Sequence, residues 1–235
     1  MTAPSSPAAP MGAARLAGAL YLLIILLGLT SEVALRGSLI MPGDAVATAE
    51  AILAQPGTLR LSLAADTVMA LADVALAVLL YLLLRPVSGA LALMAMVFRL
   101  VQAALIAMSL LFQYGALLIL QGGGAPDAAM LALQLHGHGY DLGLVFFGVN
   151  SLLTGWLLVI SGYVPKLLGG LIAAAGVVYI LGSAILFMAP AMAGLFAPAY
   201  LLPVLSETAF CLWLLVRGLG PRTPDRGREA ESRQR

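Results

Sequence analysis

Residues 61–100 read LSLAADTVMALADVALAVLLYLLLRPVSGALALMAMVFRL. Two long apolar runs are joined here by a short turn, RPVSG, at residues 85–89. A run of roughly 20 apolar residues is long enough to cross the hydrocarbon core of a bilayer as a helix. Such a segment must be helical in lipid, because a helix satisfies its own backbone N–H and C=O groups. The stretch therefore predicts a hairpin of two membrane-spanning helices.

The rest of the chain has the same apolar character. Of its 235 residues, 62% are hydrophobic and only 10% are charged, whereas a soluble domain carries about 25% charged residues. We therefore expect an all-α integral membrane protein, built as a bundle of six transmembrane helices. The expected spans are residues 14–35, 59–84, 90–120, 140–160, 166–188 and 198–216.

Polar segments flank and interrupt these spans. Residues 1–13 form a leader rich in Pro, Ala and Ser, residues 14–217 the membrane domain, and residues 218–235 an arginine-rich cytoplasmic tail. Both flanking segments are expected to be disordered, because they lack apolar residues that could form a core. Between the first two spans, Asp44 is a good helix N-cap and Pro56-Gly57 a stop signal. This predicts a short helix on the outer surface, either a plain connector or a lid.

Orientation is predicted by the basic residues in short loops, which concentrate on the cytoplasmic side. On this basis both termini are cytoplasmic, and the protein lies in the cell membrane, the inner or plasma membrane of a bacterium. A net charge of +1 gives no indication of nucleic-acid binding, so membrane lipid is the expected partner. The side that we assign to the cytoplasm carries Arg15, Arg85, Lys166 and the tail arginines, and the outer side carries Arg36 and Arg60.

Ionisable residues inside a span are costly, and they usually face the bundle interior or a water-filled cavity. At 1.5 Å of rise per residue, Asp73 lies about 16 Å from the cytoplasmic end of its span, Arg99 about 14 Å and Glu207 about 15 Å. All three therefore share the midplane. The tight RPVSG hairpin allows Asp73 to pair with Arg99, and this pair could be structural or functional.

A second polar level lies nearer the outer side. The same rise places Glu32 and Asp66 about 27 Å from the cytoplasmic end, and Asp141 about 30 Å. Asp66 and Asp73 lie on one face of their helix, because they are two turns apart. Together the two levels predict a polar column from the outer mouth to the midplane.

The chain has two histidines, His136 and His138, and both lie beside this outer level. In a helix they point about 200° apart, so His136 shares a face with Tyr140, and His138 with Asp141. In an extended segment both would point to the same side. A metal site usually needs three or four protein ligands, so neither a metal nor another cofactor is expected. A ligand-orienting or proton-responsive imidazole and a simple hydrogen-bonded one both remain open.

Several short motifs occur in a familiar order. They are ARLAGALYLL at 14–23, PGDA at 42–45, TLRLSLAAD at 58–66, YLLLRPV at 81–87, LH at 135–136, GY at 139–140, FFG at 146–148, SGYVPKLLG at 161–169, Glu207, and WLLVRG at 213–218. In this order the chain resembles the bacterial membrane proteins of the Domain of Unknown Function 4386 family.

The resemblance implies a six-span helical protein and carries no established activity. The positions that match the family pattern are Asp44, Arg60, Asp66, His136, Tyr140 and Glu207. Non-ionisable residues stand in the family at the positions of His138 and Asp141, which argues against a metal or haem site made by two histidines.

The leading hypothesis is a protein that binds or transports a small molecule or lipid through a polar cavity open to the outer side. The alternatives are an intramembrane enzyme using His136 with Asp66 or Glu32, and a non-catalytic accessory subunit. Whether the protein is an enzyme stays open, as does its oligomeric state. The ligand-binding candidates are Asp66, His136, Tyr140, Glu207, Glu32 and Asp44, and the candidates for a structural ion pair are Asp73 and Arg99.

Overall fold

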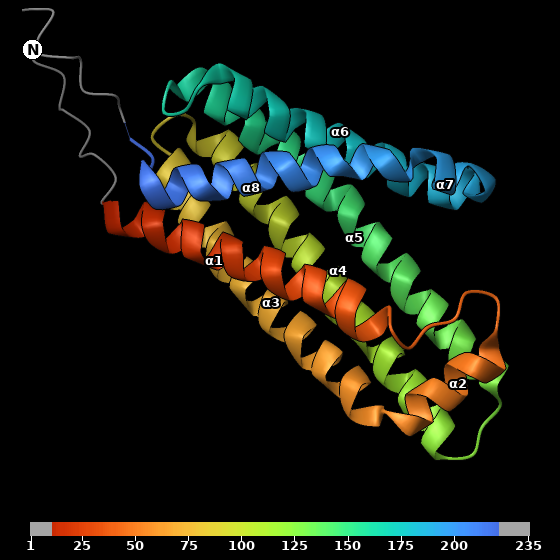
Figure 1. The fold of residues 1–235 in the computed structure, drawn as a ribbon. Helices are drawn as coiled ribbons and strands as arrows, with labels where there is room; N and C mark the ends of the chain where they lie inside the picture. The colour runs from red at the N-terminus through yellow and green to blue at the C-terminus, as the bar shows by residue number, and fades with distance from the viewer. Residues whose placement is uncertain (1–10, 221–235) are drawn as a thin grey trace, which may run out of the picture.

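The computed structural model describes residues 11–220, so the expected disorder of the leader up to residue 10 and of the tail from residue 221 lies outside it. Within the described residues the fold is all helical, and six helices are long and apolar enough to cross a membrane (Figure 1). The predicted six-helix bundle is confirmed, and the protein is a multi-pass membrane protein.

The first span consists of α1 (Met11–Leu29) and a π-helical continuation, η1 (Thr30–Arg36). The next four spans are α3 (Pro56–Leu84), α4 (Gly89–Gln121), α5 (Pro126–Ser161) and α6 (Lys166–Met188). The last span covers Pro190–Val216. It begins with three short turns, η2 (Pro190–Met192), α7 (Ala193–Phe196) and η3 (Ala197–Tyr200), and continues as α8 (Leu201–Val216).

The fourth span differs most from its expected bounds. The sequence predicts its start at residue 140, but α5 begins at Pro126, so both histidines lie well inside the helix. Pro126 suits the first turn of a helix, because its missing N–H has no intrahelical partner there. The extra turns are stabilised by burial of Ala129 and Leu133 in an apolar cluster. This contact outweighs the helix-weakening effect of Gly137 and Gly139.

The predicted short helix between the first two spans is present as α2 (Ala45–Ala54). The Asp44 carboxylate accepts a hydrogen bond of 2.9 Å from the backbone N–H of Ala47, as an N-cap does. α2 ends directly before Pro56, and Pro56 is the first residue of α3. Gln55 is therefore the single residue between the two helices. α2 packs against α3, α4 and α5.

The six spans form a ring in which α1 contacts α3, then α4, α5, α6 and α8 follow in turn, and α8 returns to α1. At the end where Met11 lies beside Gly218, here called the terminal end, α1 and α8 are in contact. Toward the opposite, distal end they separate, and α4 and α5 are visible between them (Figure 1).

Close helix approach at the α5–α6 contact depends on glycine. A Cβ added to Gly155 would lie 2.5 Å from the backbone nitrogen of Ala173 and 2.6 Å from the carbonyl oxygen of Gly169. Gly176 meets Gly148 of α5 in the same way, so α6 presents a face of small residues to α5. Such faces let backbones approach closely where lipid supplies no hydrophobic drive between helices.

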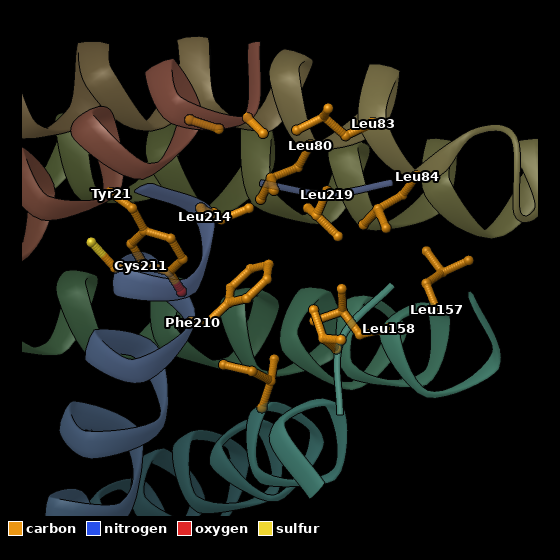
Figure 2. Close-up of a cluster of buried hydrophobic side chains, with 14 of the residues drawn as sticks. Tyr21, Leu80, Leu83, Leu84, Leu157, Leu158, Phe210, Cys211, Leu214 and Leu219 are labelled. Carbon is orange, nitrogen blue, oxygen red and sulfur yellow. The ribbon is translucent and has the colours of Figure 1, made fainter. Parts of the chain in front are cut away.

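Two buried apolar clusters occupy the two ends of the bundle. The first, at the terminal half, includes Tyr21, Leu80, Leu157 and Phe210, from four different spans (Figure 2). The second lies under α2 at the distal end and includes Ile52. Between these clusters the interior is polar, and the candidate site lies there.

Candidate functional site

A cavity of about 470 Å³ lies between the two apolar clusters. Its wall is formed by residues of α1, η1, α3, α4, α5, α6, η3 and α8. It brings together both candidates for the structural pair and five of the six ligand-binding candidates from the sequence, namely Asp73, Arg99, Glu32, Asp66, His136, Tyr140 and Glu207.

The distal wall of the cavity is organised by Arg36. Its Nη1 donates hydrogen bonds to Asp66 Oδ2 at 2.7 Å and to Gln113 Oε1 at 3.2 Å. Its Nη2 forms an ion pair with Glu32, one turn earlier. Ser62 accepts from both Arg36 and Gln113, at 3.3 and 3.1 Å. These contacts join η1, α3 and α4 in one buried network.

The sequence predicts that Arg36 is a loop residue on the outer side, but the structure buries it, with 5% of its surface exposed. The cause is local: residues 30–36 continue the first span as a π-helix, which holds Arg36 on the helix and beside α3. π-Helical turns often occur at functional sites. The signal available in the sequence was Glu32, because an acid four residues before a base commonly pairs with it on a helix.

At mid-depth, Arg99 of α4 pairs with Asp73 of α3. Arg99 Nε donates to Asp73 Oδ1 at 2.6 Å, and Nη2 lies 2.5 Å from the same oxygen. The guanidinium carbon lies 5.2 Å from the ring centre of Tyr21 and 5.0 Å from that of Phe147. Cation–π attraction of this kind is strongest where the cation has lost its water. The hairpin pair predicted from the sequence is therefore present, and two aromatic rings support it.

His136 faces the cavity from α5, and its ring packs edge-to-face against Tyr140 at 6.4 Å. Its Nδ1 lies 3.1 Å from both the carbonyl oxygen and Oγ of Ser109. The Ser109 hydroxyl group donates its own proton to the carbonyl oxygen of Ile106 at 2.7 Å. Nδ1 of the neutral ring must therefore be the donor, and Nε2 is left as an acceptor.

Among the residues described, this Nε2 is buried and has no hydrogen-bond partner. Likewise, none of the hydrogen bonds formed within residues 11–220 joins His136 to a carboxylate. Asp66, the acid expected to assist it in the enzymatic alternative, has its Oδ2 on Arg36 instead. The arrangement presents an imidazole acceptor to the cavity rather than an imidazole activated by an acid.

Glu207 of α8 lies on the opposite wall. Its Oε1 accepts a hydrogen bond of 2.6 Å from the hydroxyl of Tyr179 on α6. The Tyr179 ring packs against Phe147 at 5.1 Å and against Tyr200 at 6.0 Å. Tyr179 was not singled out from the sequence, although a tyrosine in mid-span needs a partner for its hydroxyl.

Two of the residues considered from the sequence lie away from this wall. Asp44 caps α2 and is not among the residues that line the cavity. His138 is exposed, and its Nδ1 donates a hydrogen bond of 2.7 Å to the carbonyl oxygen of Gln134. Its ring packs on Phe187. The helix thus separates the two histidines, as the helical alternative predicts.

Within the described part of the chain there is no group of three or more His, Cys, Asp or Glu side chains arranged to hold a metal ion. Asp66 and Asp73 each form a buried ion pair with an arginine. What the cavity offers is a set of hydrogen-bond acceptors, ion pairs and aromatic rings, which suits recognition of a molecule.

Comparison with known proteins supports the resemblance seen in the motifs. The sequence profile of a family described as Domain of unknown function (DUF4386) matches residues 16–218. An uncharacterized protein of Archaeoglobus fulgidus is 33% identical over 146 residues, which cover 62% of this chain and 76% of that protein. No solved structure gives a significant match. With its six spans and a family match over nearly its whole length, the chain belongs to the DUF4386 family of membrane proteins.

Proposed function

We propose that this protein binds a small molecule or a lipid in the cavity between its two apolar clusters, and that it serves as a binding or transport protein in the cell membrane. One observation carries the proposal: a chain this apolar keeps a cavity of about 470 Å³ at mid-depth and lines it with buried polar side chains. Ligand pockets in proteins typically measure about 300–1,000 Å³.

The free-energy cost of burying two ion pairs supports a functional role for them. Arg36, Asp66, Asp73 and Arg99 are all at least nine-tenths buried. Replacing a buried ion pair with apolar residues of similar volume is often neutral or stabilising, so stability alone gives little reason to keep two of them. Their side chains line the cavity, where they are available to a ligand.

The cavity opens on one side in this conformation. The apolar cluster around Phe210 and Leu157 fills the terminal half of the bundle (Figure 2), so we expect it to close the cavity on that side. Glu32, whose side chain is 68% exposed, lies at the open rim in the distal half. The distribution of basic residues predicts that the distal end faces the outside. The ligand therefore enters from the outer side, and transport would require opening of the terminal cluster.

The test fills the cavity without disturbing the helices. Gly137 lines the cavity, and a Cβ added to it meets no atom within 4 Å. Gly137→Trp therefore projects an indole into the ligand space. Gly115 of α4 also has open space around its Cβ but does not line the cavity, so Gly115→Trp is the matched control. Native mass spectrometry of protein purified from its own membrane measures the bound molecule.

We expect the wild type and Gly115→Trp to retain a defined molecule, and Gly137→Trp to lose it. The proposal is overturned if Gly137→Trp retains the same molecule as the wild type. It is also overturned if the wild type retains none and no ligand in a broad metabolite and lipid screen raises its melting temperature.

A further inference from the structure

We infer that the ligand carries a protonated amine on an apolar body, so that the site is one for an organic ammonium ion. This inference rests on the proposed function and specifies the chemical class of its ligand. Four features of the cavity support it: its balance of charge, its unused acceptors, its aromatic wall and its apolar rim.

The charges that line the cavity do not balance. Five carboxylates face two guanidinium groups, and Arg36 and Arg99 form ion pairs with Glu32, Asp66 and Asp73. Asp141 and Glu207 make no ion pair with any described residue. Glu207 is buried, whereas Asp141 is partly exposed. A buried carboxylate without an opposite charge is costly, so Glu207 in particular favours a ligand of positive charge and disfavours an anion.

Among the described residues, the buried atoms of the cavity lining without a hydrogen bond are two acceptors and one donor, Arg99 Nη2, and this donor already lies in the ion pair with Asp73. The two acceptors therefore favour a ligand that donates. His136 Nε2 and Gln102 Oε1 are both buried, and neither has a partner among residues 11–220. His136 is 3% exposed and Gln102 is 5% exposed. Both residues line the cavity. An ammonium group has three N–H donors. These could donate hydrogen bonds to the two acceptors and to the Glu207 carboxylate.

The wall beside Glu207 is aromatic. Tyr140, Tyr179 and Tyr200 line the cavity, and Tyr179 and Tyr200 pack against one another with ring centres 6.0 Å apart. Aromatic faces attract organic cations, and aromatic cages are a common means of binding substituted ammonium groups. A small hydrated inorganic cation gains little from such a wall, because it is stabilised mainly by oxygen ligands.

Part of the edge of the cavity, next to Glu32, is apolar. Leu29 of α1 and Val204 of α8 both line the cavity and are both exposed, at 47% and 42%. They come from the two helices that separate toward the distal end (Figure 1). Both residues belong to apolar membrane-spanning segments, so we expect this part of the edge to face the hydrocarbon of the bilayer. The apolar body of the ligand would lie here, with the ammonium group deeper, toward Glu207.

Two sources share this chemistry, a free organic amine and the headgroup of an aminolipid. The test uses isothermal titration calorimetry and the full-length protein in phosphatidylcholine nanodiscs, because the quaternary ammonium headgroup of this lipid has no N–H to donate. The probes are 4-phenylbutylammonium and 4-phenylbutyrate, which differ mainly in the sign of their charge. We expect the cation to bind and the anion to bind at least tenfold more weakly.

Two cavity variants and one control complete the test. Glu207→Gln removes the carboxylate expected to meet the ammonium group and should weaken cation binding at least tenfold. The second variant, Asp141→Asn, keeps the test possible if Glu207→Gln does not fold. Asp141 makes no hydrogen bond with any other described side chain, so this change leaves the packing intact, and it should weaken cation binding severalfold. Glu50→Gln changes an exposed acid of α2 outside the cavity and should bind as the wild type does.

The inference is overturned if 4-phenylbutyrate binds as well as the cation, if both cavity variants bind the cation like the wild type, or if sodium binds and the organic cation does not. Weaker binding of the cation in phosphatidylethanolamine nanodiscs would identify the lipid headgroup as the ammonium source, and unchanged binding would identify a free amine. Anion binding that Gly137→Trp abolishes would overturn the ammonium inference alone and leave the proposed function standing.

Discussion

Arg36 and Asp66 belong to different spans and share a buried hydrogen bond of 2.7 Å between Nη1 and Oδ2. Both are almost completely buried, and the same guanidinium group also contacts Glu32 and Gln113. The bond therefore fixes the π-helical end of the first span against α3 and sets the distal wall of the cavity. The bond also explains how the guanidinium group of Arg36 can be buried inside the bundle.

Removal of Arg36 should destabilise the protein strongly. Arg36→Met leaves the carboxylate of Asp66 buried without its partner, which typically costs about 3–5 kcal/mol. The change is measured as a loss of melting temperature in detergent. Arg60→Met removes an exposed arginine near the same end of α3 and should leave the melting temperature unchanged. Equal melting temperatures for the wild type and Arg36→Met would contradict a structural role for the pair.

Asp73 and Arg99 should behave as a coupled pair. Asp73→Leu leaves a buried guanidinium group and Arg99→Met a buried carboxylate, so each single variant should be less stable than the double variant. The measurement is a double-mutant cycle from denaturant unfolding in detergent. Additive effects, with the double variant the least stable of the three, would show that the pair contributes no coupling energy.

The α5–α6 contact should tolerate no side chain at Gly155. The added methyl group of Gly155→Ala would come within 2.6 Å of two backbone atoms of α6, so the helices must move apart. Overpacking of this kind costs about 1–3 kcal/mol. Gly170→Ala is the control, because a Cβ there meets no atom within 4 Å. A lower melting temperature is expected for Gly155→Ala only.

The two histidines should differ in their effect on ligand binding. His136→Phe removes the free Nε2 acceptor from the cavity, and loss of one hydrogen bond to a charged donor costs about 1.5–3 kcal/mol, or roughly 10- to 150-fold in affinity. His138→Phe alters an exposed residue outside the cavity and should bind as the wild type does. Calorimetry with 4-phenylbutylammonium measures both. Similar losses for the two variants would argue that neither histidine contacts the ligand.

Orientation in the membrane can be tested by cysteine labelling of intact cells. Cys211 is buried, so it should contribute little background. A membrane-impermeant maleimide should label Ser38→Cys, at the exposed distal turn, without permeabilisation. It should label Gly12→Cys, at the terminal end, only after the membrane is opened. The reverse pattern would invert the predicted topology and place the cavity mouth on the cytoplasmic side.

Much of the fold follows from short-range properties of the sequence. The span of α6 and the cap at Asp44 agree with their expected positions, because apolar length and N-cap chemistry act locally. The start of α5 did not follow, because the turns from Pro126 are stabilised by burial of Leu133 against residues distant in the chain. A local pattern contains no information on such contacts.

The candidate site divides in the same way. The depth of Asp73, Arg99 and Glu207 could be estimated from helical rise alone, and the hairpin brings Asp73 to Arg99. The burial of Arg36 could not be inferred, since it depends on a π-helical turn and on Ser62 and Gln113 of two other helices. Long-range partners of this kind are set by how the helices pack.

By itself the sequence determined that this protein is a six-span helical membrane protein with ionisable groups at two depths. The length of an apolar run and the position of a residue along a helix both follow from the order of residues in the chain. Tertiary structure alone decided that His136 of α5 and Glu207 of α8 line one cavity, and that the imidazole keeps an acceptor free within it. Those facts depend on the rotation and separation of helices, which are set by contacts such as Gly155 against Ala173, far apart in the chain.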